Sequence, residues 1–74
     1  MSVQMPVELN STDESILREL AEGRCTPSFL EHRTDYTRQA IQGRLTVLRA
    51  SEHIVKVDTG LYEITDKGRD ALND

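Results

Sequence analysis

Apolar residues recur along this chain first at helical spacing and then in two short alternating runs. In the first segment, Ile16 and Leu20 belong to a stripe that repeats every three to four residues, which predicts an amphipathic helix. Ser11 followed by Glu14 matches a capping box, in which each side chain binds the backbone of the other residue. The sequence therefore predicts a helix with Ser11 as its N-cap and Gly23 as its end.

Two more helices, separated by a tight turn, are predicted in the middle of the chain. Thr26 followed by Pro27 is typical of an N-cap and a first helical residue, and this short helix is expected to end near residues 34–35. Thr37 is expected to open the next helix, which runs to about Ser51. The apolar stripe of this helix, at positions i, i+4 and i+7, consists of Ile41, Leu45 and Leu48.

The two alternating runs, residues 54–58 and 61–64, are predicted to form a β-hairpin around a two-residue loop, Thr59-Gly60. In that register one face of the hairpin is wholly apolar and the other carries an opposite-charge pair. A slip by one residue would lose both features. The predicted cross-strand pairs are Asp58 with Leu61, Val57 with Tyr62, Lys56 with Glu63, and Val55 with Ile64.

These elements predict an α+β, mostly helical fold: a winged helix-turn-helix with a three-helix core, a β-hairpin wing and a short C-terminal helix. Thr65 is the expected cap of that last helix, which extends to about Leu72. Residues 1–10 are expected to form an extended arm, because apolar and polar residues alternate there and Pro6 disfavours a central strand. The arm is either a partly ordered tail or a cover for the core or a partner subunit. Residues 11–74 form the predicted domain.

The ordered set of motifs resembles the small winged helix-turn-helix regulators of halophilic archaea, including relatives of a haloarchaeal phage repressor. The matching residues are Asp35-Tyr36-Thr37-Arg38-Gln39, Arg44-Leu45 with Leu48, Gly60-Leu61-Tyr62-Glu63-Ile64, and Thr65 followed by Lys67-Gly68. The resemblance covers roughly residues 11–72 and implies DNA binding by the third helix. One departure is Glu52-His53, where many relatives have Gly-Leu at the end of that helix.

Charge is distributed unevenly along the chain, whose net charge is -4. Residues 24–49 carry five arginines against two acids, whereas residues 1–23 carry one arginine against five acids. Residues 50–74 carry three bases against six acids. We call residues 24–49 the basic island, and it marks where a polyanion could bind. The acid surplus, with seven arginines and two lysines, fits a salt-rich cytoplasm.

The third predicted helix has a polar face that suits the major groove of DNA. Successive residues advance by about 100°, which places the apolar stripe on one side and a polar face on the other. That face consists of Gln39, Gln42, Gly43 and Thr46, with Arg38 beside it at the helix start. Glutamine can bind adenine through two hydrogen bonds, and arginine can bind guanine in the same way. The alternative is an ordinary solvated helix face.

Other polar residues of the basic island and of the predicted hairpin are expected to contact the DNA backbone. Arg33 and Arg49 are expected phosphate contacts, and Thr37 could reach a phosphate as well as cap its helix. Lys56 is a phosphate contact from the wing unless Glu63 neutralises it. Arg44 lies at the border of the apolar stripe, where it is either an intramolecular ion-pair residue or a base reader.

The expected partner is double-stranded DNA, bound by a transcription regulator that is a monomer or a homodimer on a two-fold site. The rival interpretation is a winged-helix protein-interaction module, and RNA binding is a third. No cofactor, catalytic group or metal site is predicted, because His32 and His53 lie on different elements without ligand spacing. Cys25, the one cysteine, is expected to be a small core residue, with a redox sensor as the alternative. No apolar run is long enough for a membrane span, and a reducing cytoplasm is the expected location.

Overall fold

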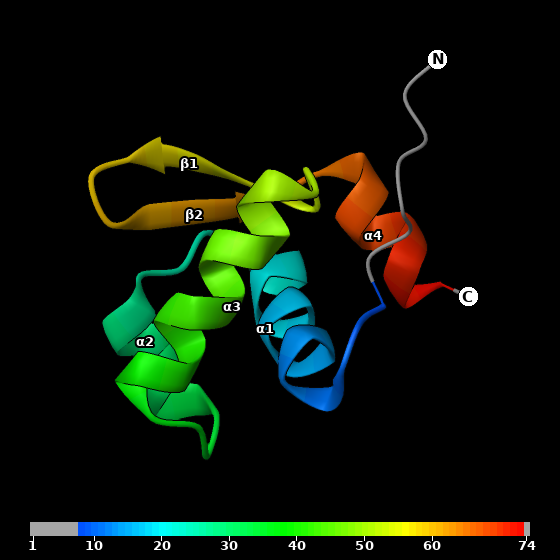
Figure 1. Cartoon of the computed structure of the whole chain (residues 1–74). Helices are drawn as coiled ribbons and strands as arrows, with labels where there is room; N and C mark the ends of the chain where they lie inside the picture. Colours follow the sequence, from blue (N-terminus) through cyan, green and yellow to red (C-terminus); the bar gives the residue numbers. More distant parts are fainter. Residues whose placement is uncertain (1–7, 74) are drawn as a thin grey trace.

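The computed structural model describes residues 8–73, which form four helices and a two-stranded antiparallel sheet (Figure 1). This confirms an α+β, mostly helical chain, and the layout is compatible with a winged helix. Within these residues no helix is both long and apolar enough to cross a membrane. The elements in chain order are α1 (Ser11–Glu22), α2 (Pro27–Arg33), α3 (Arg38–Ala50), β1 (Ile54–Asp58), β2 (Leu61–Ile64) and α4 (Asp66–Leu72).

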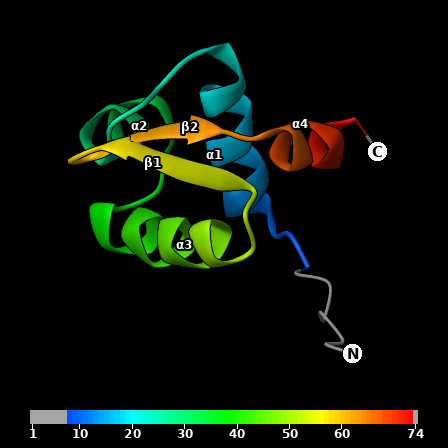
Figure 2. The same cartoon turned by 90° about the horizontal axis from the view of Figure 1, so that it is seen from above.

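The core lies where α1 meets α3, the hairpin and α4 (Figure 2). The apolar stripes predicted for the first and third helices are confirmed except at Ala21, which is only partly buried. The other members, Ile16, Leu17, Leu20, Ile41, Leu45 and Leu48, are at most 1% exposed. Of the two large apolar side chains of α2, Leu30 is buried, whereas Phe29 is half exposed. The buried apolar residues are Ile16, Leu17, Leu20, Cys25, Leu30, Ile41, Leu45, Leu48, Ile54, Tyr62 and Ile64.

Three of the predicted helix caps are confirmed. The side-chain hydroxyls of Thr26, Thr37 and Thr65 each accept a hydrogen bond from the backbone N–H three residues further on. Each cap satisfies one of the N–H groups that a helix start leaves without a partner. The starts of α2, α3 and α4 are therefore encoded locally, by one threonine each.

The predicted cap of the first helix is wrong by one residue. Asn10 is the N-cap: its Oδ1 accepts the Asp13 N–H at 2.8 Å, and Asp13 Oδ2 accepts the Asn10 N–H at 3.0 Å. Glu14 is exposed, whereas Asp13 is fully buried and bound by an arginine of α3, which fixes the capping box one position earlier. Asn10 thus belongs to the domain rather than to the predicted arm, most of which (residues 1–7) lies outside the described residues.

The predicted hairpin register is also wrong, except at Asp58, which does lie opposite Leu61. Val57 is a bulge residue, so the pairs that follow are shifted by one: Lys56 with Tyr62, Val55 with Glu63, and Ile54 with Ile64. In the loop only Gly60 has a positive φ, of 68°, whereas the hairpin turns that match strand twist need a positive φ at their first central residue. The bulge supplies extra local twist. As a result Ile54 is buried, while Val55 and Val57 are exposed.

Cys25 connects the loop between α1 and α2 to the hairpin. Its N–H donates to the Tyr62 carbonyl at 3.0 Å, and the Tyr62 N–H donates back to the Cys25 carbonyl at 2.9 Å. β2 therefore lies between β1 and this short bridge, an arrangement that sequence periodicity did not predict. The predicted burial of Cys25 is confirmed at 3% exposure, and burial raises the pKa of its thiol, which disfavours the reactive thiolate.

The end of α3 is closed by a Schellman motif built on a non-glycine residue. The His53 N–H donates to the Leu48 carbonyl at 2.9 Å, and the Glu52 N–H donates to the Arg49 carbonyl at 3.0 Å. Glu52 has a φ of 65°, in the left-handed region where glycine is normally found. The departure from Gly-Leu noted in the sequence therefore falls at the one non-glycine positive φ among residues 8–73.

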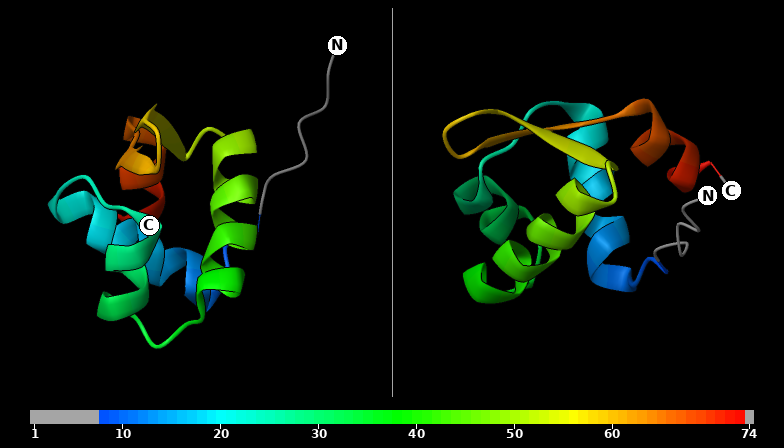
Figure 3. Two further views of the ribbon diagram at one scale, coloured as in Figure 1. Left: turned by 90° about the vertical axis from the view of Figure 1, so that its left-hand side faces the viewer. Right: turned by 45° about the horizontal axis from the view of Figure 1, so that its top comes forward.

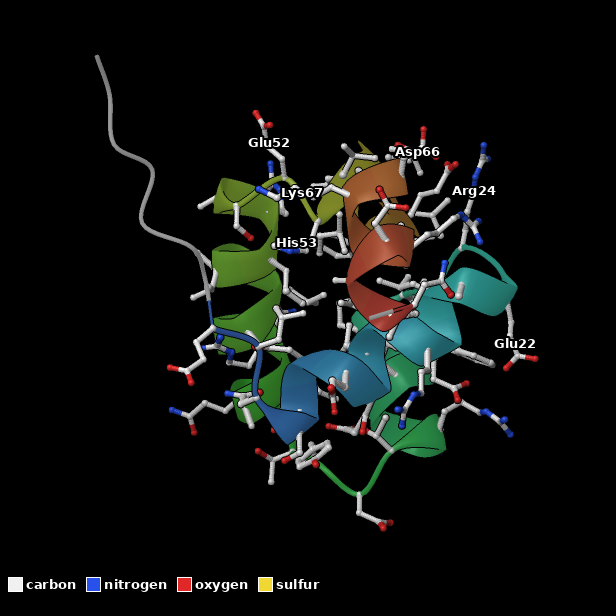
Figure 4. All side chains as sticks on the ribbon, turned by 90° about the vertical axis from the view of Figure 1, so that its right-hand side faces the viewer. Glu22, Arg24, Glu52, His53, Asp66 and Lys67 are labelled. Atoms are coloured by element: carbon white, nitrogen blue, oxygen red, sulfur yellow. The ribbon has the colours of Figure 1, made fainter. Side chains whose placement is uncertain are left out.

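Residues of α4 and its cap hold this helix end in place (Figure 4). Lys67 Nζ donates to the Ser51 carbonyl, and Thr65 Oγ1 donates to the Glu52 carbonyl, both at 2.7 Å. Gly68 packs so closely that a Cβ there would collide with the His53 carbonyl oxygen and lie 2.6 Å from a side-chain carbon of Ile64. The loop that joins α3 to the hairpin is thus held by α4 and its cap.

Candidate nucleic-acid interface

One side of α3 is free of packing and forms an outer side of the molecule (Figure 3). We define the outward face as the exposed residues Gln39, Gln42, Gly43 and Thr46, with Arg38 and Arg49 at its two ends. All six were predicted as DNA contacts, and the helix brings them together on one surface. No residue of α3 is acidic. The face therefore offers amide, hydroxyl and guanidinium groups without a carboxylate of its own.

The outward face has features that internal packing does not require. A Cβ at Gly43 would meet no atom of the described structure within 4 Å, so glycine is not needed there for helix packing. Glycine nevertheless costs a helix about 1 kcal/mol relative to alanine. Thr46 Oγ1 donates to the Gln42 backbone carbonyl at 3.1 Å, and neither Gln39 nor Gln42 makes a side-chain hydrogen bond within residues 8–73. Thr37 is exposed and serves as the helix cap, with its hydroxyl accepting the Ala40 N–H at 3.2 Å.

Arg44 occupies the flank of α3 that faces α1, and it makes an intramolecular ion pair with Asp13. Nε and Nη2 donate to the two carboxylate oxygens at 2.7 and 2.8 Å. Asp13 is fully buried, whereas the Arg44 side chain is 28% exposed. Hydrogen bonding to this carboxylate raises the pKa of Arg44. Of the two roles considered for Arg44, the structure contains the ion pair.

The basic island is largely neutralised in three dimensions by carboxylates from the acidic ends of the chain. Four of its five arginines form ion pairs, and three of the partners lie outside residues 24–49. The pairs are Arg24 with Glu63 at 3.0 Å, Arg33 with Glu19 at 2.9 Å, Arg38 with Glu31 at 3.6 Å, and Arg44 with Asp13. The positive charge counted along the sequence therefore overstates the charge available to a polyanion.

Arg49 and Lys56 are the exposed cations of the predicted set that form no ion pair within residues 8–73. Arg49 lies in the last turn of α3, and Lys56 lies on the hairpin that follows it. Lys56 is opposite Tyr62 rather than Glu63, so the expected neutralisation by Glu63 is absent, and Glu63 binds Arg24 instead. Both are therefore exposed positive charges, Arg49 at one end of the outward face and Lys56 on the hairpin.

Arg33 is the predicted contact that the fold separates from the others. Arg33 is the last residue of α2. Its side chain points toward α1, where Nε donates a hydrogen bond to Glu19. The residue that sequence reasoning missed is Glu31, the one acid of α2, which approaches Arg38. The sequence did contain a signal for such a partner. The third helix begins with an arginine and has no acid in its first turn, so a carboxylate from another element was to be expected near Arg38.

No set of three histidine, cysteine or acidic side chains could hold a metal ion in the part of the chain that the structure describes. No family model, curated protein or solved structure matches this chain. Its function therefore has to be inferred from the chemistry of the site itself.

Proposed function

We propose that this protein binds double-stranded DNA sequence-specifically, as a repressor-like winged-helix transcription regulator. In this proposal α3 enters the major groove and the β1–β2 hairpin is the wing against the backbone. The observation that carries the proposal is the outward face of α3: an exposed helix surface with two glutamine amides, an arginine at each end and no acid. The resemblance to haloarchaeal phage-repressor relatives supports the same function.

The chemistry of the outward face matches the edges of base pairs. A major groove about 12 Å wide admits one α-helix, and the residues near the helix start usually contact the bases. Gln39 and Gln42 would bind adenine through N6 and N7, while Arg38 would bind guanine through O6 and N7. Gly43 removes a side chain where the helix backbone would lie deepest in the groove. A helix that merely faces solvent has no need of that glycine.

Among the predicted contacts, only Arg49 and Lys56 are cations without an ion pair within residues 8–73, which predicts weak non-specific binding. Phosphate contacts give the logarithm of affinity a slope of about −0.9 per contact against the logarithm of salt concentration. With Arg49 and Lys56 as the main phosphate contacts, we expect a slope of only about −2. Such a protein would depend on base contacts for its affinity. This fits a sequence-specific regulator better than a non-specific architectural DNA-binding protein.

A protein-interaction module is the second candidate function, because the hairpin exposes apolar side chains. Val55 and Val57 are 44% and 41% exposed, and Phe29 of α2 is 49% exposed. Apolar side chains that bind a protein partner would make the hairpin, rather than α3, the interface. A homodimer on a two-fold DNA site would join both candidates, with one surface for DNA and another for the second copy.

A binding titration against selected and scrambled duplexes at several salt concentrations tests the proposal. Gln39→Ala should cost about 1–3 kcal/mol on the best duplex and weaken the preference at one base pair. Arg49→Ala should weaken binding to all sequences about equally and reduce the salt slope by roughly one. Arg18→Ala is the matched control, because Arg18 is an exposed arginine of α1 away from the outward face. It should change neither quantity.

The two candidates give different outcomes in this experiment. If no duplex is preferred and Gln39→Ala changes nothing, sequence-specific DNA binding by α3 is wrong. If in addition Val55→Thr abolishes self-association or binding to an identified protein, the interaction module is favoured. Because Gln39, Arg49 and Arg18 are exposed, each variant should change the free energy of unfolding by only about 0.5 kcal/mol.

A further inference from the structure

Arg38 occupies a position that helix electrostatics disfavours. It is the first residue of α3, where the unpaired N–H groups create partial positive charge. Acidic residues normally occupy this turn, yet the first turn of α3 contains none. A cation at the positive end of a helix requires either an anionic partner within the protein or a ligand that it binds. Arg38 has an anionic partner within the protein.

The partner is Glu31, which approaches Arg38 from α2. Oε2 of Glu31 lies 3.6 Å from Nε of Arg38, and the two side chains are 40% and 47% exposed. This distance is that of an ion pair rather than of a hydrogen bond. By contrast, Arg44 gives both Nε and Nη2 to its carboxylate at 2.8 Å or less. The atoms of Arg38 and Glu31 that approach most closely are thus Nε and Oε2, and Arg38 donates no hydrogen bond to this carboxylate.

The edge of Arg38 that carries its two terminal nitrogens is one of the edges that can bind guanine. A guanidinium offers five N–H donors in a planar fork, and two of them match O6 and N7 of guanine. With the carboxylate at Nε, the Nη1 and Nη2 groups remain available to a base. The negative charge of the nearby Glu31 carboxylate also repels phosphate. It therefore disfavours the competing contact between Arg38 and the DNA backbone.

We propose that Glu31 is a positioning residue for base recognition: it holds Arg38 by Nε so that the terminal nitrogens read a guanine rather than a phosphate. This inference rests on the proposed DNA-binding function and adds the residue that determines specificity at one position. The gain comes from restricting a long, flexible side chain before DNA arrives, which lowers the entropy lost on binding. Glu31 contributes selectivity and, because it is negative, reduces overall affinity.

The test compares Glu31→Gln with the matched control Glu19→Gln. Both glutamates are paired with an arginine Nε, and both substitutions remove one negative charge, but Glu19 pairs with Arg33 on the α1 side. Binding is measured on the best duplex and on a duplex in which the guanine read by Arg38 is replaced by adenine. Arg38→Ala should lower the guanine preference by about tenfold or more. Glu31→Gln should lower it by about two- to fivefold, the range expected of an exposed ion pair.

A second readout separates positioning from a structural role. In an Arg38→Ala background, Glu31→Gln should have no effect on base preference, because its action passes through Arg38. Glu31→Gln alone should also raise affinity for scrambled duplexes, and Glu19→Gln should leave base preference unchanged. If Arg38→Ala loses the guanine preference but Glu31→Gln retains it, the positioning role is wrong and DNA recognition stands. If the wild type prefers no duplex, the proposed function itself is wrong.

Discussion

The two flanks of α3 carry arginines with the same chemistry and very different surroundings. Arg44 faces α1 and binds a carboxylate that is fully buried, through two hydrogen bonds. Arg38 faces α2 and lies beside a carboxylate that is 40% exposed, without a hydrogen bond. A buried pair cannot be broken without leaving a charge in the interior, whereas an exposed pair can exchange its partner for water or a ligand. One arginine therefore holds the helix, and the other is available to a partner.

The largest expected effect follows from breaking the pair on the inner flank. Asp13→Asn removes the charge that Arg44 binds, so the free energy of unfolding should fall by about 3 kcal/mol. Glu31→Gln, which removes the exposed counterpart, should change it by about 0.5 kcal/mol or less. Urea denaturation followed by circular dichroism measures both. If both variants lost the same free energy of unfolding, the ion pairs on the two flanks of α3 would not differ in their contribution to stability.

The next effect concerns the junction that fixes the end of α3. Gly68→Ala places a methyl group against the His53 carbonyl and the Ile64 side chain, so α4 has to move away. We expect a loss of about 2 kcal/mol, in the range of other overpacked sites. Gly43→Ala is the matched control, since a methyl group there meets only solvent and should stabilise the helix by up to about 1 kcal/mol. Thermal unfolding of the two variants should shift in opposite directions.

A smaller, stabilising effect is expected at the left-handed residue that ends α3. Glu52 has a φ of 65°, which costs a residue with a Cβ about 1 kcal/mol or more. Glu52→Gly should remove this strain, and the added freedom of the unfolded chain should offset part of the gain. A net gain of about 0.5 kcal/mol is expected in chemical denaturation. Glu52→Ala keeps the strain and should show no gain, so a stabilised alanine variant would point to the charge instead of the backbone.

The smallest effect is a dependence of stability on pH through His53. Burial, together with the Lys67 ammonium, lowers the pKa of His53 below its usual 6.5, while Asp13 acts in the opposite direction. The unfolded chain therefore binds a proton at this site at a higher pH than the folded chain does. The contribution to stability is present above pH 6.5 and is lost as the pH falls from there through the lower pKa of the folded state. His53→Gln should flatten the dependence of the free energy of unfolding on pH below 6.5. Substitution of the exposed His32 should leave the wild-type dependence in place.

Helix starts were predictable because each depends on one side chain and the backbone three residues on. Thr26, Thr37 and Thr65 were identified in this way. The first helix shows the limit of such reasoning, because Ser11–Glu14 and Asn10–Asp13 both fit a capping box. The choice between them depends on Arg44, which lies 31 residues from Asp13 in the sequence.

The hairpin register and the charge of the interface were not predictable for related reasons. The alternation of apolar and polar residues predicts which residues share a face of the hairpin only while the strands keep one register. The bulge at Val57 shifts that register by one residue. The basic island looked available because its partners, Glu19, Glu63 and Asp13, belong to distant segments. The polar face of α3, by contrast, follows from helical geometry alone and could be read from the sequence.

The fixing of α3 entirely from its inner side has a consequence for how such proteins diversify. Its buried stripe, the bond to Asp13 and the contacts from Lys67 and Thr65 all avoid the outward face. Substitutions at Gln39, Gln42 or Thr46 thus escape selection for folding. Descendants of this sequence could acquire new partners through a few neutral steps, with the scaffold inherited unchanged.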